Sequence, residues 1–391
     1  MGHGPKGVAI LGSTGSIGRQ TLDVIRRLPG QFRIVALAAG ANHTLLEDQS
    51  REFHPDLVWC QAEGRHMDIK AAAGRKTGWA TMDEMAAHPD VEIVVVATAG
   101  AAGLAPTLAA LRAGKAVALA NKEVLVMAGH IVTAEAERGG GELRPVDSEH
   151  SAIWQCLWGE DVGAVEKLIL TASGGAFRDL PVRDLDRVTP REALRHPTWD
   201  MGRKVTIDSA TLMNKGFEAI EARWLFNVPM DRVEVLMHRE SIVHSLVEFA
   251  DGSVKAQLGE PDMRLPIQCA LSYPERVPSD AVPRLNLARA KTLNFEAPDF
   301  SRYPCLRLAL EAGAKAGTWP AVLAAADEVA VERFVGGEIG FREIAKVVDA
   351  TLSAHDGAAD PDLGQVLAAD AWAREFASAH AGRANVAVQR N

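Results

Sequence analysis

The sequence predicts an α/β protein with three parts: an N-terminal parallel sheet covered by helices, an α+β region with a mainly antiparallel sheet, and a C-terminal helical bundle. Continuously apolar runs alternate with helical stretches up to about residue 146, which is typical of a parallel sheet buried on both faces. Alternating strands joined by a turn at Asp251 and Gly252 predict the antiparallel sheet. From Cys305 onward, Ala, Leu and Glu recur at helical spacing between breaks, which predicts roughly four helices.

Composition restricts the class of protein. The 391 residues carry a net charge of −9, which excludes general nucleic-acid binding because phosphate backbones require a basic excess. No apolar run approaches the length of a membrane span. The four cysteines are scattered without a CxxC pair, which indicates reduced thiols, and the first strand begins by about Gly7, without room for a targeting peptide. We therefore expect a cytoplasmic protein that acts on small molecules.

A glycine-rich turn follows the first strand. Residues 7–11 are apolar, the stretch GSTGSIG occupies Gly12–Gly18, and a helical pattern follows from Thr21. Strand, glycine turn and helix in this order form the phosphate-binding start of a Rossmann-like unit, with the pyrophosphate at the helix N-terminus. A purely structural turn is the alternative. No Gly-Lys-Ser/Thr ending occurs, which argues against a P-loop.

The end of the second strand, Arg33–Ala38, indicates the cofactor. A site that prefers NAD usually has an acidic residue here, which binds the ribose 2′-hydroxyl. This chain has none before Glu47. Since a carboxylate would repel a 2′-phosphate, its absence favours NADP. No Arg or Lys stands at the strand end either, so Asn42 and His43 are the nearest polar candidates.

Polar residues follow a later strand, Lys115–Ala120. Asn121, Lys122 and Glu123 come directly after it. Polar groups at the carboxyl ends of parallel strands face the crevice in which such sheets bind ligands. An ordinary surface pair of Lys122 and Glu123 is the alternative.

The stretch PVDSEH follows the strand-like residues 142–146 and precedes a helical pattern that starts near Ser151. In a strand, Asp147 and Glu149 point to the same side and could share a cation. Carboxylate oxygens suit the hard cations Mg²⁺ and Mn²⁺. In the alternative interpretation, Asp147 and Ser148 cap the helix and Glu149 favours its first turn.

Two stretches of the second region bring polar groups into turns. Ser173 lies in the turn ASGG after a strand at Lys167–Thr171, where a hydroxyl and backbone N–H groups could bind an anion. His196, Trp199 and Met201 lie in a loop bounded by Pro and Gly. They either bury in the core or form a lid over a ligand.

A polar helix follows. Val205–Asp208 is expected to be a short strand, and Ser209 the N-cap of the helix after it. Helical spacing puts Asn214, Lys215 and Glu218 on one face. An isolated Lys–Glu pair is a surface contact, but this helix also carries apolar residues that pack, so the three polar groups indicate a phosphate and metal site.

Seven motifs occur in order between about residues 7 and 275: GSTGSIG, LANKE, PVDSEH, ASGG, HPTWDMG, DSATLMNKGFE and LGEPDM. Together they resemble the 1-deoxy-D-xylulose 5-phosphate reductoisomerase family of the methylerythritol phosphate route to isoprenoids. The C-terminal tail agrees with that family in length and helical character. Seven ordered motifs are far more specific than a single glycine loop.

The resemblance implies a homodimeric enzyme that uses NADPH and Mg²⁺, Mn²⁺ or Co²⁺. It would rearrange the carbon skeleton of 1-deoxy-D-xylulose 5-phosphate and reduce the product aldehyde, giving 2-C-methyl-D-erythritol 4-phosphate. The implied domains are an NADPH-binding Rossmann-like domain, a catalytic domain that binds metal and substrate, a linker and a C-terminal helical domain. Their ranges are 1–147, 148–273, 274–304 and 305–391.

The resemblance also implies roles for individual residues. The metal ligands would be Asp147, Glu149 and Glu218, and Lys122 would join them as a catalytic residue that touches substrate. Further substrate contacts would be Ser148, Glu149, Ser173, His196, Trp199, Ser209, Asn214, Lys215 and Glu218, with Met201 in the lid. The cofactor site would comprise Thr14, Gly15, Ser16, Ile17, Gly40, Asn42, Asn121, Glu123, Gly202 and Met263.

The chain departs from the family pattern at two places. A basic residue often follows Gly40 in the family, but here Ala41 does, which leaves 2′-phosphate recognition to hydroxyls, Asn42 and backbone. The family commonly reads His-Pro-Gln-Ser where this chain has His238, Arg239, Glu240 and Ser241. The role of that turn is therefore open.

Two other functions are compatible with parts of the sequence. Another NADP-dependent dehydrogenase of sugar phosphates or aldehydes would share the glycine turn. A glyceraldehyde-phosphate type would need a catalytic Cys in a turn, whereas Cys156 falls in an apolar helix. A non-catalytic dinucleotide sensor would keep GSTGSIG but would have no need of Asp147, Glu149 and Glu218 together.

Overall fold

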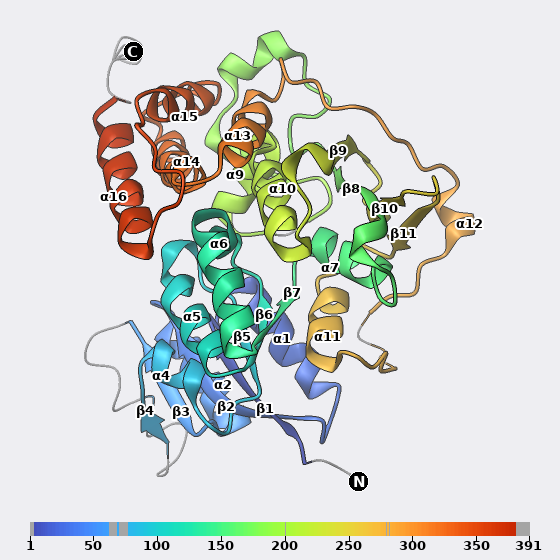
Figure 1. Ribbon diagram of the computed structural model, residues 1–391, viewed down its shortest axis with the longest axis vertical. Coiled ribbons are helices and arrows are strands. Elements are labelled where there is room, and N and C mark those ends of the chain that lie inside the picture. The colour runs from blue at the N-terminus through green and yellow to red at the C-terminus, as the bar shows by residue number, and fades with distance from the viewer. Residues whose placement is uncertain are drawn as a thin grey trace. The chain divides into compact units, whose positions relative to one another are not determined.

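The computed structural model describes residues 4–61, 69, 77–199, 201–278, 280 and 282–380. The chain divides into two compact units (Figure 1). Unit 1 comprises Met1–Leu125, Gly129–Asp161 and Ala256–Leu287. Unit 2 comprises Val126–Ala128, Val162–Lys255 and Ala288–Asn391.

Unit 1 is built on a parallel sheet of seven strands in the order β4-β3-β2-β1-β5-β6-β7. The strands are β1 Lys6–Leu11, β2 Phe32–Ala39, β3 Leu57–Cys60, β4 Gly78–Trp79, β5 Ile93–Val96, β6 Ala116–Leu119 and β7 Glu142–Pro145. Their central residues are buried and rich in Val, Ile, Leu and Ala, because helices cover both faces. The predicted parallel sheet is confirmed.

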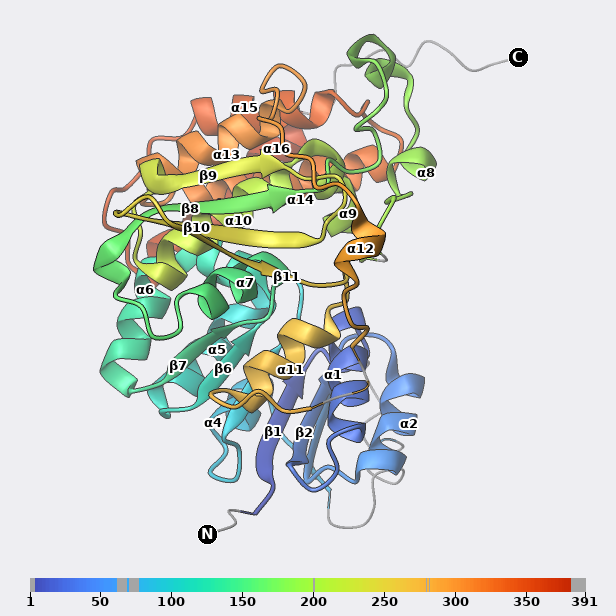
Figure 2. The same cartoon turned by 90° about the vertical axis from the view of Figure 1, so that its right-hand side faces the viewer.

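Helices cover the two faces of this sheet. The helices of unit 1 are α1 Ser16–Arg26, α2 His43–Phe53, α4 Met82–Ala87, α5 Leu104–Arg112, α6 Lys122–Gly139, α7 Ser148–Cys156 and α11 Arg264–Ser272, with the short η1 Gly100–Gly103. One apolar cluster joins α1, α2 and α11 to the strands, and α4, α5 and α6 lie on the other face (Figure 2). A segment beyond residue 255 therefore completes the core of the N-terminal sheet.

The strand order reverses direction at β1, which lies between β2 and β5. At such a switch point the loops after neighbouring strands leave on opposite sides of the sheet and open a crevice at the carboxyl ends of the strands. GSTGSIG follows β1, and residues 97–103 follow β5. The sheet thus brings the glycine turn to the position that binds ligands in this architecture.

A second, mixed sheet has four strands in the order β11-β10-β8-β9, of which β8, β9 and β10 lie wholly in unit 2. The strands are β8 Val165–Ala172, β9 Val233–Met237, β10 Val243–Phe249 and β11 Val254–Leu258. β10 runs antiparallel to β8, and β9 runs parallel to it. Gly252, with φ +83°, forms the turn between β10 and β11. The sheet therefore differs from the mainly antiparallel expectation at the β8–β9 pair.

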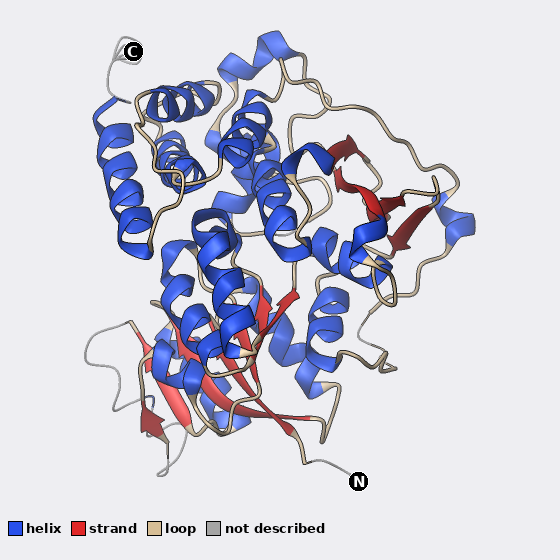
Figure 3. Cartoon of the chain, in the orientation of Figure 1, coloured by secondary structure: helices blue, strands red, loops and turns tan. Residues whose placement is uncertain are grey.

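The remainder of unit 2 is helical. Its helices are α8 Pro190–Ala193, α9 Arg203–Thr211, α10 Met213–Phe226, α12 Leu287–Ala290, α13 Pro304–Lys315, α14 Trp319–Val335, α15 Glu343–Ser353 and α16 Leu363–His380, with the short η2 Val162–Ala164, η3 Val182–Arg187 and η4 Met230–Arg232. The predicted four C-terminal helices are present as α13 to α16, coloured as helix in Figure 3. In this unit α13 packs on α10 and α14 contacts α9.

Two local expectations were wrong. Val205–Asp208 belongs to helix α9 and not to a strand, and Ser209 lies inside α9 and not at an N-cap. α9 ends because Leu212 adopts the left-handed conformation, with φ 58° and ψ 15°, and α10 starts at Met213. The β-branched Val, Thr and Ile of this stretch favour strands only weakly, and helical packing overrides that preference.

No helix among the described residues combines the length and the apolar character needed to cross a bilayer. The four cysteines are buried or partly buried thiols.

Candidate active site

The glycine turn after β1 leaves no room for a side chain at Gly12 or Gly18. A Cβ on Gly12, whose φ is +97°, would lie 2.4 Å from Ala97 O at the end of β5. A Cβ on Gly18 would lie 2.3 Å from Gly12 O. α1 begins at Ser16, so the turn leads the backbone directly into a helix N-terminus. The turn therefore fits the pyrophosphate of a dinucleotide, which needs close backbone approach and helix N–H groups.

Other predicted cofactor residues of unit 1 lie on α1, at the start of α11 and in the segment between β2 and α2. Ile17 and Met263 both pack against the apolar cluster beneath α1 and α11. Asn42 is the N-cap of α2, where its Oδ1 accepts from Leu45 N at 3.2 Å. Gly40 O accepts from Cys60 Sγ at 3.4 Å. Ile17 and Met263 therefore contact the same apolar cluster, whereas Asn42 caps α2.

Asn121 ties together the loops after β5 and β6. It is the N-cap of α6 and is almost fully buried. Its Nδ2 donates to Gly100 O at 2.9 Å and to Thr98 Oγ1 at 3.2 Å, while its Oδ1 accepts from Val124 N. Glu123 lies in the first turn of α6.

Lys122 and Asp147 form an ion pair, with Nζ 2.5 Å from Oδ2. The two side chains are 14% and 16% exposed, so Lys122 belongs to a largely buried ion pair. Burial by itself raises the pKa of Asp147, but the Lys122 cation and the His150 ring hold this pKa well below its ordinary value. Asp147 is therefore a carboxylate at every physiological pH.

The PVDSEH stretch is already helical from Ser148, three residues before the expected start. Asp147 is the N-cap and accepts from Ser148 N at 3.1 Å, and Ser148 Oγ donates to Glu149 Oε2 at 2.6 Å. Carboxylate oxygens of Asp147 and Glu149 nevertheless lie within 4.8 Å of each other. Both interpretations hold in part: the carboxylates converge, but through a helix cap and first turn and not through strand alternation.

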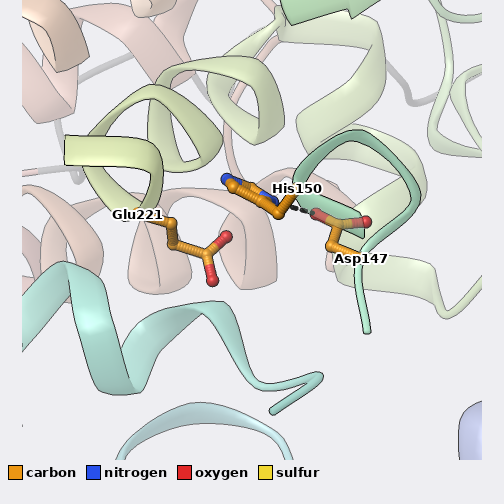
Figure 4. A group of neighbouring side chains, drawn as sticks. All are labelled: Asp147, His150 and Glu221. Atoms are coloured by element: carbon orange, nitrogen blue, oxygen red, sulfur yellow. Dashed lines mark ion pairs between the residues drawn. The ribbon is translucent and has the colours of Figure 1, made fainter. Parts of the chain in front are cut away.

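His150 is a neighbour that received no role from the sequence. It is fully buried on α7, with Nδ1 3.5 Å from Asp147 Oδ2 (Figure 4). The i, i+3 spacing of these residues, with Asp147 as the N-cap of α7, is the signal that could have identified this contact.

In unit 2, α10 carries three polar side chains on one face, as predicted. Glu218 Oε2 lies 2.5 Å from Lys215 Nζ, and Glu218 Oε1 accepts from Asn214 Nδ2 at 2.5 Å. The side chains of Lys215 and Glu218 are only 4% and 1% exposed. A carboxylate this buried is tolerated because a cation and an amide satisfy both of its oxygens.

The ASGG turn packs against the end of α9. Gly174 and Gly175 both have positive φ, and a Cβ on Gly175 would lie 2.5 Å from Ser209 O. Only glycine permits this approach, which sets the Ser173 turn against the α9 segment that carries Ser209. Both hydroxyls of the predicted phosphate set therefore belong to one packed region of unit 2.

Two residues that the sequence did not single out hold this turn. Arg178 donates to Ser173 O at 3.1 Å. Tyr303, which is buried, donates its hydroxyl to Gly174 O at 3.3 Å. Tyr303 lies 129 positions from Gly174, so no local sequence pattern predicts this contact.

His196 joins the predicted lid to the same turn. Its Nδ1 accepts from Thr198 N at 3.1 Å and from Trp199 N at 2.8 Å, so the ring proton is on Nε2, which donates to Ser173 Oγ at 3.1 Å. Burial, assisted by the Arg178 cation, lowers the pKa of His196 to about 4. Gly202 is the N-cap of α9, and the ring centre of Trp199 lies 6.4 Å from that of His244.

The turn that departs from the family pattern is a structural anchor. The buried His238 accepts from Val243 N at Nε2, and its Nδ1 lies 2.9 Å from Asn294 O and 3.1 Å from Glu240 Oε2. Asn294 Nδ2 also donates to Glu240 Oε1. The turn thus attaches the segment around Asn294 to the sheet of unit 2.

The chemistry of the two carboxylate sets fits a hard divalent cation. Asp147 and Glu149 in unit 1, and Glu218 in unit 2, offer oxygen ligands only, and in each unit a lysine pairs with one of these carboxylates. Such oxygen-rich sets are typical of Mg²⁺ and Mn²⁺ sites.

Known proteins resemble the chain along almost its whole length. Models described as 1-deoxy-D-xylulose 5-phosphate reductoisomerase and as two C-terminal domains of the same enzyme match residues 8–129, 143–226 and 258–376. A protein of that name from Pelotomaculum thermopropionicum is 54% identical over 95% of this chain and 97% of its own length. The protein of that name from Heliobacterium modesticaldum is 52% identical over 96% of this chain and 98% of its own length.

Solved structures agree. The reductoisomerase from Zymomonas mobilis in complex with NADPH superposes with a TM-score of 0.90 at 41% identity, covering 97% of this chain and 100% of that one. A reductoisomerase in complex with NADPH, fosmidomycin and magnesium has a TM-score of 0.90 at 40% identity, covering 96% and 98%. These likenesses confirm the predicted fold class, and the chain belongs to the 1-deoxy-D-xylulose 5-phosphate reductoisomerase family.

Proposed function

We propose that this chain is an NADPH- and metal-dependent reductoisomerase. It converts 1-deoxy-D-xylulose 5-phosphate to 2-C-methyl-D-erythritol 4-phosphate for isoprenoid precursor biosynthesis. The observation that carries the proposal is the family membership of a chain that has two largely buried lysine–carboxylate pairs, Lys122–Asp147 and Lys215–Glu218, at the expected site residues. A nucleotide sensor would gain nothing from burying two such pairs.

Asp147, Glu149 and Glu218 would hold the divalent cation, which is Mg²⁺, Mn²⁺ or Co²⁺. When bound, the cation supplies a Lewis acid that polarises the carbonyl and adjacent hydroxyl of the substrate. Lys122 places a cation beside Asp147, and Ser148 places a hydroxyl beside Glu149, so both side chains orient the ligand oxygens. Mg²⁺ is the ion named in the solved relatives.

The substrate phosphate would bind to Ser173, Ser209, Asn214 and Lys215. Lys215 supplies the positive charge, and the ASGG turn supplies backbone N–H groups near Ser173. The phosphate lies away from the reacting carbons, so its binding energy can orient the substrate. That orientation lowers the barrier to rearrangement. His196 and Trp199 contact substrate from the lid, which excludes water from the reactive intermediate.

The cofactor would lie on the glycine turn of unit 1, where it would supply the hydride that reduces the rearranged aldehyde. Its site comprises Thr14, Gly15, Ser16, Ile17, Gly40, Asn42, Asn121, Glu123, Gly202 and Met263. No acidic residue follows β2 before Glu47, which suits the 2′-phosphate of NADPH.

We further propose the domain roles that the family pattern implies. Residues 1–147 bind the cofactor, 148–273 bind metal and substrate, 274–304 link, and 305–391 form a helical support. We also propose that the protein works as a homodimer in the cytoplasm, where its thiols stay reduced.

The test is turnover of 1-deoxy-D-xylulose 5-phosphate, followed by NADPH oxidation with and without Mg²⁺. We expect oxidation only with the metal, slower oxidation with NADH, and restoration of activity when metal is returned after chelation. Undiminished activity after exhaustive chelation would refute the metal assignment. Absence of turnover with every metal and with both cofactors would refute the enzyme assignment.

A further inference from the structure

Ser13, in the middle of GSTGSIG, forms a closed pair with a glutamine on another helix. Ser13 Oγ donates to Gln49 Oε1 at 2.8 Å, and Gln49 Nε2 donates back to Ser13 O at 2.9 Å. Both side chains are buried: Ser13 is 0% exposed and Gln49 is 6% exposed. Two mutual hydrogen bonds fix the orientation of the amide as well as its position.

The pair completes the bonding of Ser13. The N–H groups of Gly12 and Ser13 both donate to Ala38 O at 2.9 Å, and Gly15 N donates to Gly12 O at 3.1 Å. With Gln49 in place, the N–H, the carbonyl and the hydroxyl of Ser13 all bond to β2 or α2. Ser13 therefore does not face a ligand. It holds the adjoining residues, from Thr14 to Ile17, in the shape that leads into α1.

Gln49 also connects two segments that approach different parts of a dinucleotide. It lies on the buried face of α2, whose N-cap is Asn42 at the end of β2. The glycine turn receives the pyrophosphate, and the end of β2 receives the ribose of the adenosine. A single side chain thus links the pyrophosphate turn to the helix that follows the ribose site, and both segments belong to unit 1.

Packing alone does not explain a glutamine at this position. Its buried neighbours on α2 include Leu46, and an apolar side chain would fill the same volume without the cost of desolvating an amide. The charged residues of α2 and of the facing side of α1 form their ion pairs on the exposed side, such as Arg26 with Glu52 and Arg51 with Asp48. The amide is therefore retained for its two bonds to Ser13.

We propose that Gln49 is a positioning residue for cofactor binding, which acts by holding Ser13 and thereby the pyrophosphate turn. The inference rests on the proposed function, because it takes the turn to be the NADPH site. Gln49 touches no reacting atom, and its contribution appears in the affinity for the cofactor, with the KM of the phosphorylated substrate unchanged.

The test is the affinity for NADP⁺, which is stable across the pH range needed, measured by calorimetry for wild type and for Gln49→Glu. A carboxylate accepts from Ser13 Oγ but repels Ser13 O, so NADP⁺ binding should be about 10-fold weaker than wild type at about pH 8.5. A buried carboxyl is protonated more readily than an exposed one. At about pH 6 its O–H donates to Ser13 O, and the deficit relative to wild type should shrink.

Two further variants separate positioning from stability. Gln49→Met keeps the volume and removes both bonds, so it should weaken NADP⁺ binding at every pH without the recovery. Gln268→Glu is the matched control: Gln268 is also buried, belongs to the same unit and donates to a backbone carbonyl, Val277 O at 2.9 Å, but does not touch the turn. It should lower the melting temperature and leave NADP⁺ affinity at the wild-type value.

The outcomes are distinguishable. Wild-type NADP⁺ affinity in folded Gln49→Glu and Gln49→Met, with only the melting temperature lowered, would overturn the inference and leave the proposed function intact. An equal loss of affinity in Gln268→Glu would overturn it as well. Failure of the wild-type protein to bind NADP⁺ would overturn the proposed function and, with it, the role of Gln49. If Gln49→Glu does not fold, Ser13→Ala, which removes only the hydroxyl, should still weaken NADP⁺ binding about 3-fold.

Discussion

Two lysine–carboxylate pairs contain expected site residues, one pair in each unit, and they are built differently. Lys122 and Asp147 lie 25 positions apart, at the start of α6 and the N-cap of α7, and their side chains are 14% and 16% exposed. Lys215 and Glu218 lie one turn apart on α10 and are 4% and 1% exposed. Both pairs have the same 2.5 Å separation.

This difference indicates which of the two pairs can change its separation. The α10 pair has its separation set by one helical turn, and Asn214 occupies the second carboxylate oxygen of Glu218. The pair in unit 1 depends on where two separate strands end, and it keeps contact with solvent. Removing one partner from a fully buried pair leaves an uncompensated charge, which costs more than the same change in a pair that keeps some contact with water. Changes at Glu218 should therefore have the larger effect.

The largest expected effect is that of Glu218→Gln. The amide keeps the shape but removes the charge that Lys215 and a divalent cation both require. We expect kcat to fall by about 10³-fold, with NADPH affinity nearly unchanged because the glycine turn belongs to the other unit. Steady-state kinetics and direct NADPH binding measure the two quantities.

A control for this substitution is Glu192→Gln, which removes a carboxylate from an exposed capping box with Thr189 in the same unit. It should leave kcat unchanged. Loss of NADPH binding in Glu218→Gln would place Glu218 in the cofactor site and contradict the assignment.

Asp147→Asn should have the next largest effect. It removes one expected metal ligand and the partner of Lys122, but the site remains partly open to water, which screens the remaining lysine. We expect a loss of about 10²-fold in kcat that a higher Mg²⁺ concentration partly restores. Titration of activity with Mg²⁺ measures it. A kcat loss larger than that of Glu218→Gln would contradict the ranking of the two pairs.

The sequence predicted the Lys215–Glu218 pair but not the Lys122–Asp147 pair, for which it offered only the position of each residue after a strand. Lys122 and Asp147 both follow strands of a parallel sheet, and parallel strands bring their carboxyl ends to one edge. Asn214, Lys215 and Glu218 share a face through helical spacing alone. The helical rule depends on local spacing, and the strand rule depends on the type of sheet. The apolar runs predict that the sheet is parallel.

Other features were beyond prediction. The helix break at Leu212 uses a left-handed leucine, whereas Gly or Asn normally marks such a position. Val205–Asp208 looked like a strand because its β-branched residues favour one, but packing within unit 2 makes it helical. The contacts of Gln49 with Ser13 and of Tyr303 with Gly174 join residues far apart in the sequence, and no spacing rule links them.

Tyr303→Phe sharpens the comparison within unit 2, because it leaves Glu218 intact and loosens only the ASGG turn. The change removes the hydroxyl that donates to Gly174 O, and the long 3.3 Å separation indicates a weak bond. We expect the KM for the phosphorylated substrate to rise about 3-fold, with kcat nearly unchanged.

The other tyrosine of the chain provides the control. Tyr273 lies in unit 1, where it packs against Trp154 with ring centres 4.6 Å apart. Tyr273→Phe should leave the KM unchanged. Equal effects of the two substitutions would show that the Tyr303 hydroxyl has no special relation to the turn.

The smallest expected effect is the pH dependence of stability that His196 contributes. Burial and the nearby Arg178 lower the pKa of His196 to about 4 in the folded protein, below the ordinary value of 6.5. Above pH 6.5 the ring is neutral in both states and its contribution is complete. As the pH falls toward 4 only the unfolded state takes up the proton, so the free energy of unfolding decreases over this window. His196→Asn keeps an acceptor for Trp199 N and should flatten the decrease, as urea unfolding at about pH 5 and about pH 7 would measure. NMR of the ring nitrogens gives the sharper check, because a His196 that titrates near its ordinary value would mean that the lid holds an imidazolium and not the neutral Nε2–H donor to Ser173.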